Sequence, residues 1–184
     1  MPNQHIAYHG GQALRRGWTT GTCAAAAAEA AALLLLTGKA PAALQLETPG
    51  GLTFTLTVEQ PRMEGDAAIC TVRKDAGDDP DITNGVGISA AVRRADSGIT
   101  IDGGAGVGRV TRPGLAMPVG AAAINPGPRA QITAALERAA RECGYTGGFS
   151  VIISAENGEE LAKQTYNGHL GVVGGLSILG TSGI

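Results

Sequence analysis

The stretch KDAGDDPDITNG, from Lys74 to Gly85, concentrates carboxylates, because four aspartates fall within seven residues beside a proline and two glycines. Such a cluster indicates a metal loop, a catalytic acid cluster or a solvated turn between strands. A calcium loop requires Asp-x-Asp-x-Asp-Gly and a distal glutamate, and these aspartates lack that spacing. Aspartate and asparagine side chains also bond their own backbone in turns. Lys74 beside Asp75 can in addition hold a pair of groups in a defined protonation state.

A second polar stretch, RRGWTTGTC, runs from Arg15 to Cys23 directly before an alanine-rich segment. It brings two arginines, three threonine hydroxyls and two glycines to the start of a predicted helix. The free backbone N–H groups of a helix N-terminus favour anions. An ordinary capped helix would explain Thr22 but not the whole set, so this stretch predicts a site for a carboxylate or a phosphate.

Two glycine-rich stretches resemble nucleotide-binding loops without matching them. In GGAGVG (Gly103 to Gly108), Arg109 stands where a third glycine would fall, and Pro113 opposes the helix that should hold a pyrophosphate. In GLSILGTS, Thr181 stands where the phosphate-binding lysine is needed. Tight glycine turns against a neighbouring backbone are the better interpretation of both.

Three further side chains have simpler explanations than chemistry. His5 and His9 have the i, i+4 spacing of helical metal ligands but lie in an N-terminal segment that we expect to fray. Cys23 lies at the start of the predicted helix, where the dipole lowers a thiol pKa. No histidine lies nearby in the sequence to act as its base, so we expect a buried small residue.

The element that must position the RRGWTTGTC stretch is a helix from Ala24 to Leu36. Alanine and leucine are strong helix formers, Thr22 can cap the start, and Gly38 suits a left-handed C-terminal position. The other expected elements are a hairpin over 44–60 that turns at Pro49-Gly50-Gly51, strands over 67–74, 86–94, 98–102 and 149–154, a helix over 130–143 and a short helix within 158–166. This order favours an α+β fold over a doubly wound α/β fold.

Composition narrows the class of protein. A formal net charge of −2 gives no general attraction to nucleic acid or to anionic membranes. The longest apolar run, Cys23 to Leu36, is interrupted by Glu29 and is short for a bilayer. The start of the chain lacks a secretion pattern, and Cys23, Cys70 and Cys143 are widely spaced. We therefore expect a cytoplasmic protein without a disulfide framework or a protein-bound metal.

Several stretches together resemble one family. RRGWTTGTCAAAAAEAA, KDAGDDPDITNG, GITIDGGAGVGRVTRPGL, AINPGPR, NGEELAKQTYN and LGVVGGLSILGTSGI have the order and spacing of CbiD, the cobalt-precorrin-5B (carbon 1) methyltransferase of anaerobic cobalamin biosynthesis. The resemblance covers 14–184 and implies the family's N-terminal α+β domain, with coiled or branching mixed sheets and about three helices, unlike Rossmann-type methyltransferases. Residues 1–13 would be a flexible tail. The apolar end at Ile184 would reflect the absence of the family's smaller C-terminal α/β domain.

The resemblance also implies an activity: transfer of a methyl group from S-adenosylmethionine to ring carbon 1 of cobalt-precorrin-5B, giving cobalt-precorrin-6A. Cobalt would enter only as part of the corrinoid substrate. The alternative is a corrinoid-binding or assembly module that is inactive without the C-terminal domain. The expected partner is this small molecule, with no nucleic acid and no membrane, and the oligomeric state is left open.

The same resemblance and its chemistry suggest site residues. The candidate catalytic carboxylates are Asp75, Asp78 and Asp81, which would take a proton from the ring system or steady the sulfonium charge. The candidate substrate contacts are Arg15, Arg16, Thr19, Thr20, Gly21, Thr22, Arg109, Arg112, Asn125 and Arg129, because a precorrin carries many carboxylate arms. The candidate contacts to the methyl donor are Gly103, Gly104, Gly106, Gly174, Gly175 and Thr181.

Two positions depart from the family pattern. Ala121-Ala122 stands where the family usually has Glu-Pro, and Asn167-Gly168-His169 stands where it has Asn-Pro-Arg. The loss of a carboxylate and a guanidinium puts substrate contacts at these two places in doubt.

Overall fold

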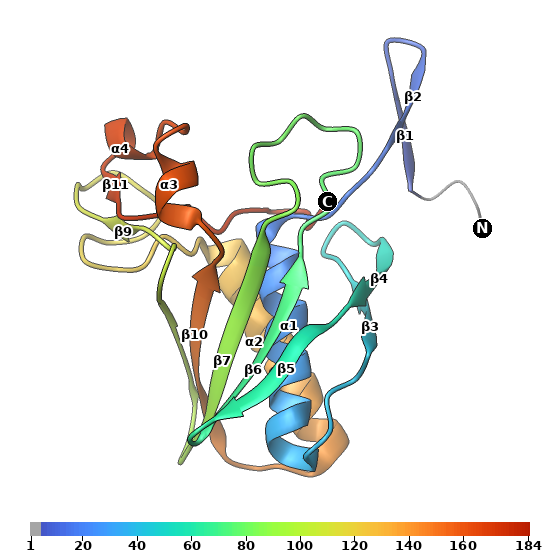
Figure 1. Ribbon diagram of the computed structural model, residues 1–184, viewed down its shortest axis with the longest axis vertical. Helices are drawn as coiled ribbons and strands as arrows, with labels where there is room; N and C mark the ends of the chain where they lie inside the picture. The colour runs from blue at the N-terminus through green and yellow to red at the C-terminus, as the bar shows by residue number, and fades with distance from the viewer. Residues whose placement is uncertain (1–4) are drawn as a thin grey trace.

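The computed structural model describes residues 5–184, and its body is one five-stranded sheet with the order β5-β6-β7-β10-β8 (Figure 1). The strands are β5 (Glu59–Glu64), β6 (Ala67–Arg73), β7 (Gly87–Ala95), β8 (Ile99–Gly103) and β10 (Gly148–Ala155). Strand β8 runs parallel to β10, and the other neighbours are antiparallel. Strand β10 therefore separates β7 from β8, although these two are consecutive in the sequence. The mixed sheet confirms the predicted α+β class.

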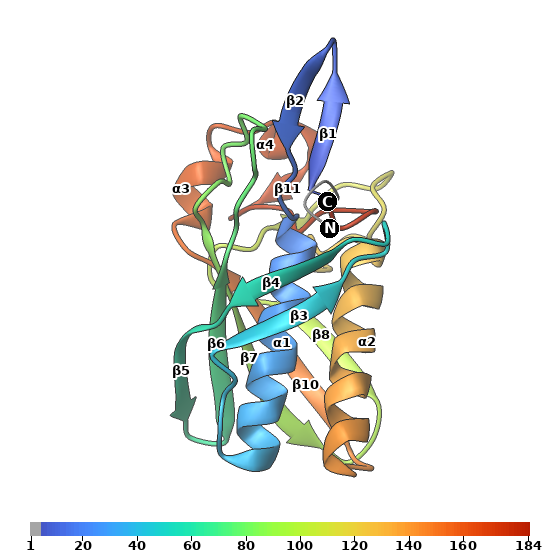
Figure 2. The same ribbon diagram turned by 90° about the vertical axis from the view of Figure 1, so that its right-hand side faces the viewer.

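Two long helices cover one face of this sheet, as the two views show (Figures 1 and 2). Helix α1 (Thr20–Thr37) lies against β6 and β7 and beside α2 (Pro126–Cys143). The eight alanines within 24–32 are all fully buried, and such small side chains allow close approach to both neighbours. A helix that is apolar on all sides is a core helix. By length and composition α1 could also cross a membrane, but 72% of it is buried inside the fold.

The helix ends follow their capping residues. Helix α1 begins earlier than predicted, since Thr19 is its N-cap and the Thr19 side chain accepts a hydrogen bond from the Thr22 N–H. The prediction that Thr22 caps the helix is therefore wrong. Gly38 ends α1 with a φ of 78°, as expected of a left-handed C-terminal residue. Helix α2 also starts before its predicted first residue, with Asn125 at its N-cap, and Gly144 ends it at a φ of 62°.

One ion pair ties the two helices together inside the protein. Glu29 on α1 has only 4% of its side chain exposed, and both of its carboxylate oxygens accept hydrogen bonds from Arg138 on α2, at 2.9 and 2.5 Å. The glutamate that interrupts the apolar run is thus paired within the core. Its cation arrives from a segment more than a hundred residues away.

Three two-stranded sheets and two short helices complete the fold. The pairs are β1 (Ile6–His9) with β2 (Gln12–Arg15), β3 (Ala43–Glu47) with β4 (Thr53–Thr57), and β9 (Arg109–Val110) with β11 (Val172–Val173). The β3–β4 pair confirms the hairpin predicted at Pro49-Gly50-Gly51. Residues 6–15 form a projecting hairpin (Figure 1). This hairpin includes residues 6–13 of the segment that was expected to be a flexible tail. Helices α3 (Gly158–Ala162) and α4 (Asn167–Leu170) replace one predicted helix, so the described residues contain four helices.

Candidate functional site

The aspartate stretch forms a closed loop at the end of the molecule where α1 begins (Figure 1). Its two ends meet, because the Gly85 N–H donates to the Lys74 carbonyl at 2.9 Å and the Lys74 N–H donates to the Val86 carbonyl at 2.9 Å. The loop is joined to the segment before α1, since the Trp18 N–H donates to the Asp75 carbonyl at 2.9 Å. The two polar stretches singled out in the sequence are therefore neighbours in space.

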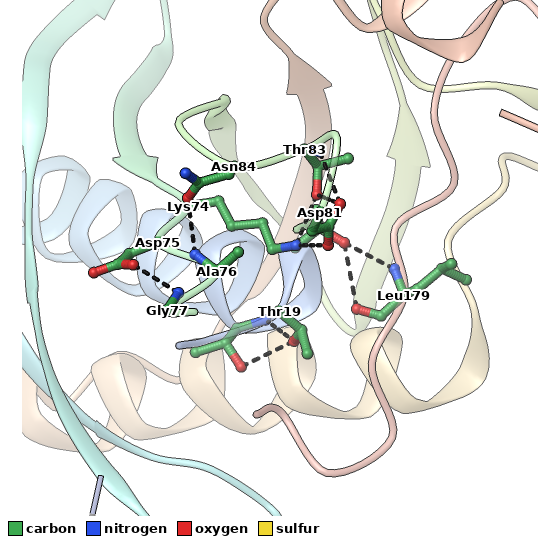
Figure 3. Close-up of polar contacts among 11 residues, drawn as sticks. Thr19, Lys74, Asp75, Ala76, Gly77, Asp81, Thr83, Asn84 and Leu179 are labelled. Atoms are coloured by element: carbon green, nitrogen blue, oxygen red, sulfur yellow. Dashed lines mark hydrogen bonds and ion pairs between the residues drawn. The ribbon is translucent and has the colours of Figure 1, made fainter. Parts of the chain in front are cut away.

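Lys74 is the cation at the centre of this loop. Only 7% of its side chain is exposed, and its ammonium group donates to the Asp81 carboxylate and, at 2.7 Å, to the Thr83 hydroxyl (Figure 3). Lys74 and Asp75, which stand side by side in the sequence, do not pair with each other. The loop folds back so that the lysine reaches a carboxylate seven positions along the chain.

Asp75 pairs instead with Arg15 on β2. The guanidinium donates to both carboxylate oxygens, at 2.7 and 2.8 Å, and the Gly77 N–H donates to one of them at 2.8 Å. The hydrogen bonds from Arg15 hold the pKa of Asp75 below its ordinary value. Asp78 accepts from the Arg15 backbone N–H at 2.6 Å. These contacts fasten the loop to the N-terminal hairpin.

Asp81 is held by three donors. Besides Lys74, the Thr83 N–H and hydroxyl both donate to its second oxygen at 2.8 Å, which confirms the expected aspartate turn. Partial burial by itself raises the pKa of Asp81, but the hydrogen bonds from Lys74 and Thr83 outweigh it, and the net pKa is lowered. A carboxylate with a lowered pKa is a weak base at neutral pH. Asp75 and Asp81 are therefore better suited to act as fixed negative charges than as proton acceptors.

We expect this ion pairing to make stability depend on acid. The folded pKa of Asp75 lies below its unfolded value of about 3.9, so the pair stabilises the fold above that pH and stops doing so as pH falls through the folded pKa. Because Arg15 is half exposed, the contribution is about 0.5 kcal/mol. Urea unfolding of Asp75→Asn should show this loss at pH 7 and a smaller one near pH 3. The exposed Asp79→Asn is the control, and an unchanged loss at both pH values would contradict the assignment.

The start of α1 is covered by the end of the chain. The Gly21 N–H donates to the Leu179 carbonyl at 3.0 Å, and the Thr22 hydroxyl donates to the Gly183 carbonyl at 2.8 Å. The Thr20 hydroxyl and Leu179 are also hydrogen-bonded, with the Leu179 N–H donating at 3.0 Å. Gly21 and Thr22, both predicted as substrate contacts, thus bind the protein's own backbone. Thr19 and Thr20 remain at the wall of a cavity.

Two cavities flank the Lys74–Asp81 pair and share Thr19, Lys74 and Asp81 in their walls. The first, here called the Thr20 cavity, has a volume of about 270 Å³ and is further lined by Thr20, Ile82, Thr83, Thr165, Asn167, Leu176, Ser177, Leu179 and Gly180. The second, the Asp79 cavity, measures about 390 Å³ and is further lined by Ala7, Leu14, Arg15, Arg16, Gly17, Trp18, Ala76, Asp78, Asp79, Pro80 and Ile184. The structure therefore brings all three predicted catalytic aspartates close to this pair of cavities.

The remaining predicted anion contacts lie elsewhere. Arg109 on β9 pairs with Asp102 at 2.7 Å, and Arg112 donates to the His169 carbonyl at 3.4 Å. Arg129 is half-buried and donates to the carbonyls of Ile124 and Ile101, at 2.7 and 3.1 Å. None of the three lines the Thr20 or Asp79 cavity. Arg129 in particular holds backbone together.

Four of the five glycines expected to contact the methyl donor are packed against other parts of the protein, two of them against backbone. A Cβ on Gly106 would lie 1.9 Å from the Ala155 carbonyl oxygen, and one on Gly175 would lie 2.3 Å from the Gly106 carbonyl oxygen. A Cβ on Gly103 or Gly104 would lie 2.8 Å from a neighbouring side chain, whereas Gly174 faces open space. This packing agrees with the interpretation of these stretches as tight turns. Thr181 lines a separate cavity between the β3–β4 turn and α2.

Two other predicted residues have structural surroundings. Cys23 is fully buried, and burial raises the pKa of its thiol to about 12, so it is the inert core residue that was expected. Asn125 lies at the start of α2 and lines a small cavity of about 150 Å³ together with Asn167 and Ser177. This small cavity shares Asn167, Ser177 and Leu179 with the Thr20 cavity, so Asn125 lines the neighbouring cavity and not the Thr20 cavity itself.

Comparison with known proteins identifies the chain's relatives. The family model of CbiD matches residues 7–184. The chain belongs to the CbiD family. It is 49% identical over 174 residues to a cobalt-precorrin-5B C(1)-methyltransferase of Ruminiclostridium cellulolyticum, covering 95% of this chain and 45% of that protein. A protein of the same name from Bradyrhizobium sp. is 54% identical over 173 residues, covering 93% and 46%.

The CbiD fold is also seen in a solved structure. The crystal structure of the cobalamin biosynthesis protein CbiD from Archaeoglobus fulgidus matches with a TM-score of 0.74 and 37% identity, covering 97% of this chain and 57% of that one. This likeness confirms the predicted fold, which is not of the Rossmann type. This CbiD chain spans about half the length of the curated relatives that it matches.

The two departures from the CbiD pattern have different surroundings. Ala122 is buried beside Arg129, whose guanidinium reaches the Ala122 carbonyl at 3.5 Å. His169 lies exposed on α4 with its ring 6.5 Å from that of Tyr166. Neither side chain lines the Thr20 or Asp79 cavity.

Sequence reasoning did not single out several residues that line the Thr20 cavity. Thr83 could have been found from the aspartate turn, because the side chain of an aspartate in such a turn accepts a hydrogen bond from the residue two positions later. No such local signal marks Asn167, Ser177 and Leu179. They line the cavity because of how residues 165–180 fold back onto the start of α1.

Proposed function

We propose that this CbiD chain takes part in the S-adenosylmethionine-dependent methylation of cobalt-precorrin-5B at ring carbon 1, giving cobalt-precorrin-6A, in anaerobic cobalamin biosynthesis. The observation that carries the proposal is the match of 93% or more of this chain to proteins named cobalt-precorrin-5B C(1)-methyltransferase at about half identity. We further infer a cytoplasmic setting and a small-molecule substrate, with no nucleic-acid or membrane partner.

The chemistry asks for little covalent assistance from the protein. S-adenosylmethionine supplies an electrophilic methyl group: the carbon–sulfur bond breaks with its electron pair left on sulfur, and a carbon–carbon bond forms at the ring. Much of the acceleration in such a displacement comes from holding the two partners in line. The protein's tasks are therefore to bind the corrinoid arms, to place a negative charge near the sulfonium and to exclude water.

The Asp79 cavity suits the cationic methyl donor. Its wall carries the carboxylates Asp78, Asp79 and Asp81 and the cations Arg15, Arg16 and Lys74. Arg15 is paired with Asp75 and Lys74 with Asp81, whereas Asp78 and Asp79 are exposed. The lowered pKa of Asp81, and of Asp75 behind it, keeps these groups ionised at neutral pH. We infer that the aspartates attract the sulfonium electrostatically and that neither Asp75 nor Asp81 acts as the base.

Calorimetric titration tests the proposal on this chain. S-adenosylmethionine and S-adenosylhomocysteine would each be titrated in the presence and absence of a cobalt corrinoid. Since only the first carries the sulfonium charge, Asp78→Asn should weaken its binding severalfold and leave the second unchanged. The isosteric change keeps an oxygen acceptor for the Arg15 N–H.

Each outcome has a meaning for the proposal. Binding of S-adenosylhomocysteine supports a donor site on these residues. Corrinoid binding alone supports the alternative, a substrate-holding module whose activity depends on further sequence. If neither binds, the proposal for this chain fails.

A further inference from the structure

The Thr20 cavity contains a cation that the proposed chemistry has not yet used. Lysine is almost never buried unless it is paired, and Lys74, at 7% exposure, lies in the wall of a cavity open to ligands. An ammonium group has three N–H donors. In the part of the chain that the structure describes, two of them are directed to Asp81 and Thr83. The third is left for a ligand.

The hydrogen bonds around Lys74 favour an acceptor from outside. The Asp81 carboxylate already accepts hydrogen bonds from Lys74 and from both donors of Thr83, so the third Lys74 N–H needs another acceptor. Asn167 offers a further donor, since its amide has two N–H groups and donates to the Gly175 carbonyl at 3.1 Å. The hydroxyl groups of Thr20 and Ser177 lie in the same wall, but each donates its one hydrogen within the protein, to the Leu179 carbonyl at 3.3 Å and to the Asn167 side-chain oxygen at 3.4 Å. The remaining N–H donors of Lys74 and Asn167 fit the two oxygens of a carboxylate.

The mouth of the cavity has the opposite character. Ile82 and Leu179 line the Thr20 cavity and are 37% and 48% exposed, and Leu170, 55% exposed, lines the adjoining cavity that shares Asn167, Ser177 and Leu179. A mostly apolar cavity with a few convergent polar groups is typical of a ligand site. A ligand with an apolar body and a charged arm would satisfy both parts.

We propose that the Thr20 cavity receives a carboxylate arm of the corrinoid substrate. Lys74 anchors the arm, and the corrinoid ring lies over Ile82 and Leu179 at the mouth. The inference rests on the proposed function, and it assigns the two cavities to different partners. The two cavities share Lys74 and Asp81, but only the Asp79 cavity adds the exposed carboxylates Asp78 and Asp79, which attract a sulfonium and repel a carboxylate arm.

The probe is dicyanocobyrinic acid, a cobalt corrinoid with free acetate and propionate arms, compared with its fully esterified methyl ester. Titrated into the chain, the acid should bind more tightly than the ester by about 10- to 100-fold, which is the value of a charge-assisted hydrogen bond in a desolvated site. Lys74→Met should lower the affinity for the acid by a similar factor and leave the affinity for the ester unchanged. The preference for the acid should therefore disappear.

The matched control is Lys39→Met, an exposed lysine at the far end of α1, which should retain the preference. Because Lys74→Met removes a buried charge and can unfold the loop, Ile82→Glu provides a second variant. It places a carboxylate at the mouth and should weaken binding of the acid more than that of the ester. Equal binding of acid and ester to the natural chain, or an undiminished preference in folded Lys74→Met, would overturn the inference. Either result leaves the donor-binding test of the proposed function intact.

Discussion

Gly106→Ala should destabilise the fold by about 3 kcal/mol or more, which is enough to prevent folding in a domain of ordinary stability. Gly106 has a φ of 78°, and an added Cβ would lie 1.9 Å from the Ala155 carbonyl oxygen and 3.2 Å from the Cα of Gly158. The Gly106 carbonyl also accepts a hydrogen bond from Leu176 at 2.8 Å. Backbone on both sides cannot yield, so the loop would have to move.

The matched control is Gly174→Ala, because this glycine has a φ of 89° and nothing within 4 Å of an added Cβ. Only the conformational strain remains, worth about 1 kcal/mol. Urea unfolding of both variants measures the difference. If Gly106→Ala were as stable as Gly174→Ala, the glycine loop would have room beside it, and a ligand-binding interpretation of GGAGVG would regain support.

The sequence predicted the helices and strands better than the long-range contacts between them. Local signals sufficed for α1, for the β3–β4 turn and for the strands at Gly87–Ala95 and Gly148–Ala155, because periodicity and capping act within a few residues. The insertion of β10 between β7 and β8 has no local signal, since it depends on a pairing across about fifty residues.

The same limit explains the errors at the site. The sequence shows Lys74 only beside Asp75, while the loop closure that brings Asp81 to Lys74 depends on hydrogen bonds at Gly85 and Val86. Gly21 and Thr22 were expected to face a ligand, yet a segment some 160 residues later supplies their acceptors. Residue types predicted the chemistry of this end of the molecule, and long-range pairing decided which groups remain available.

Arg138→Met should cost about 3 kcal/mol, the second large effect that we expect. Glu29 has 4% of its side chain exposed, and Arg138 supplies hydrogen bonds to both of its oxygens. Removing the guanidinium leaves a buried carboxylate without a cation, which is far more costly than losing the attraction itself. Arg141→Met, on the exposed side of the same helix, is the control and should change the free energy of unfolding by about 0.5 kcal/mol or less.

The double variant Glu29→Met with Arg138→Met separates the two contributions. Methionine is a good helix former and fills a similar volume, so the double variant should regain most of the stability lost in Arg138→Met, because no buried charge remains. Urea unfolding of the natural chain, the two single variants and the double variant would then give a coupling energy of about 1–3 kcal/mol between Glu29 and Arg138. Additive losses would instead mean that water reaches Glu29 through the half-exposed Arg138 side. The α1–α2 contact would then be held by its buried apolar side chains, with the ion pair fixing only how the two helices align.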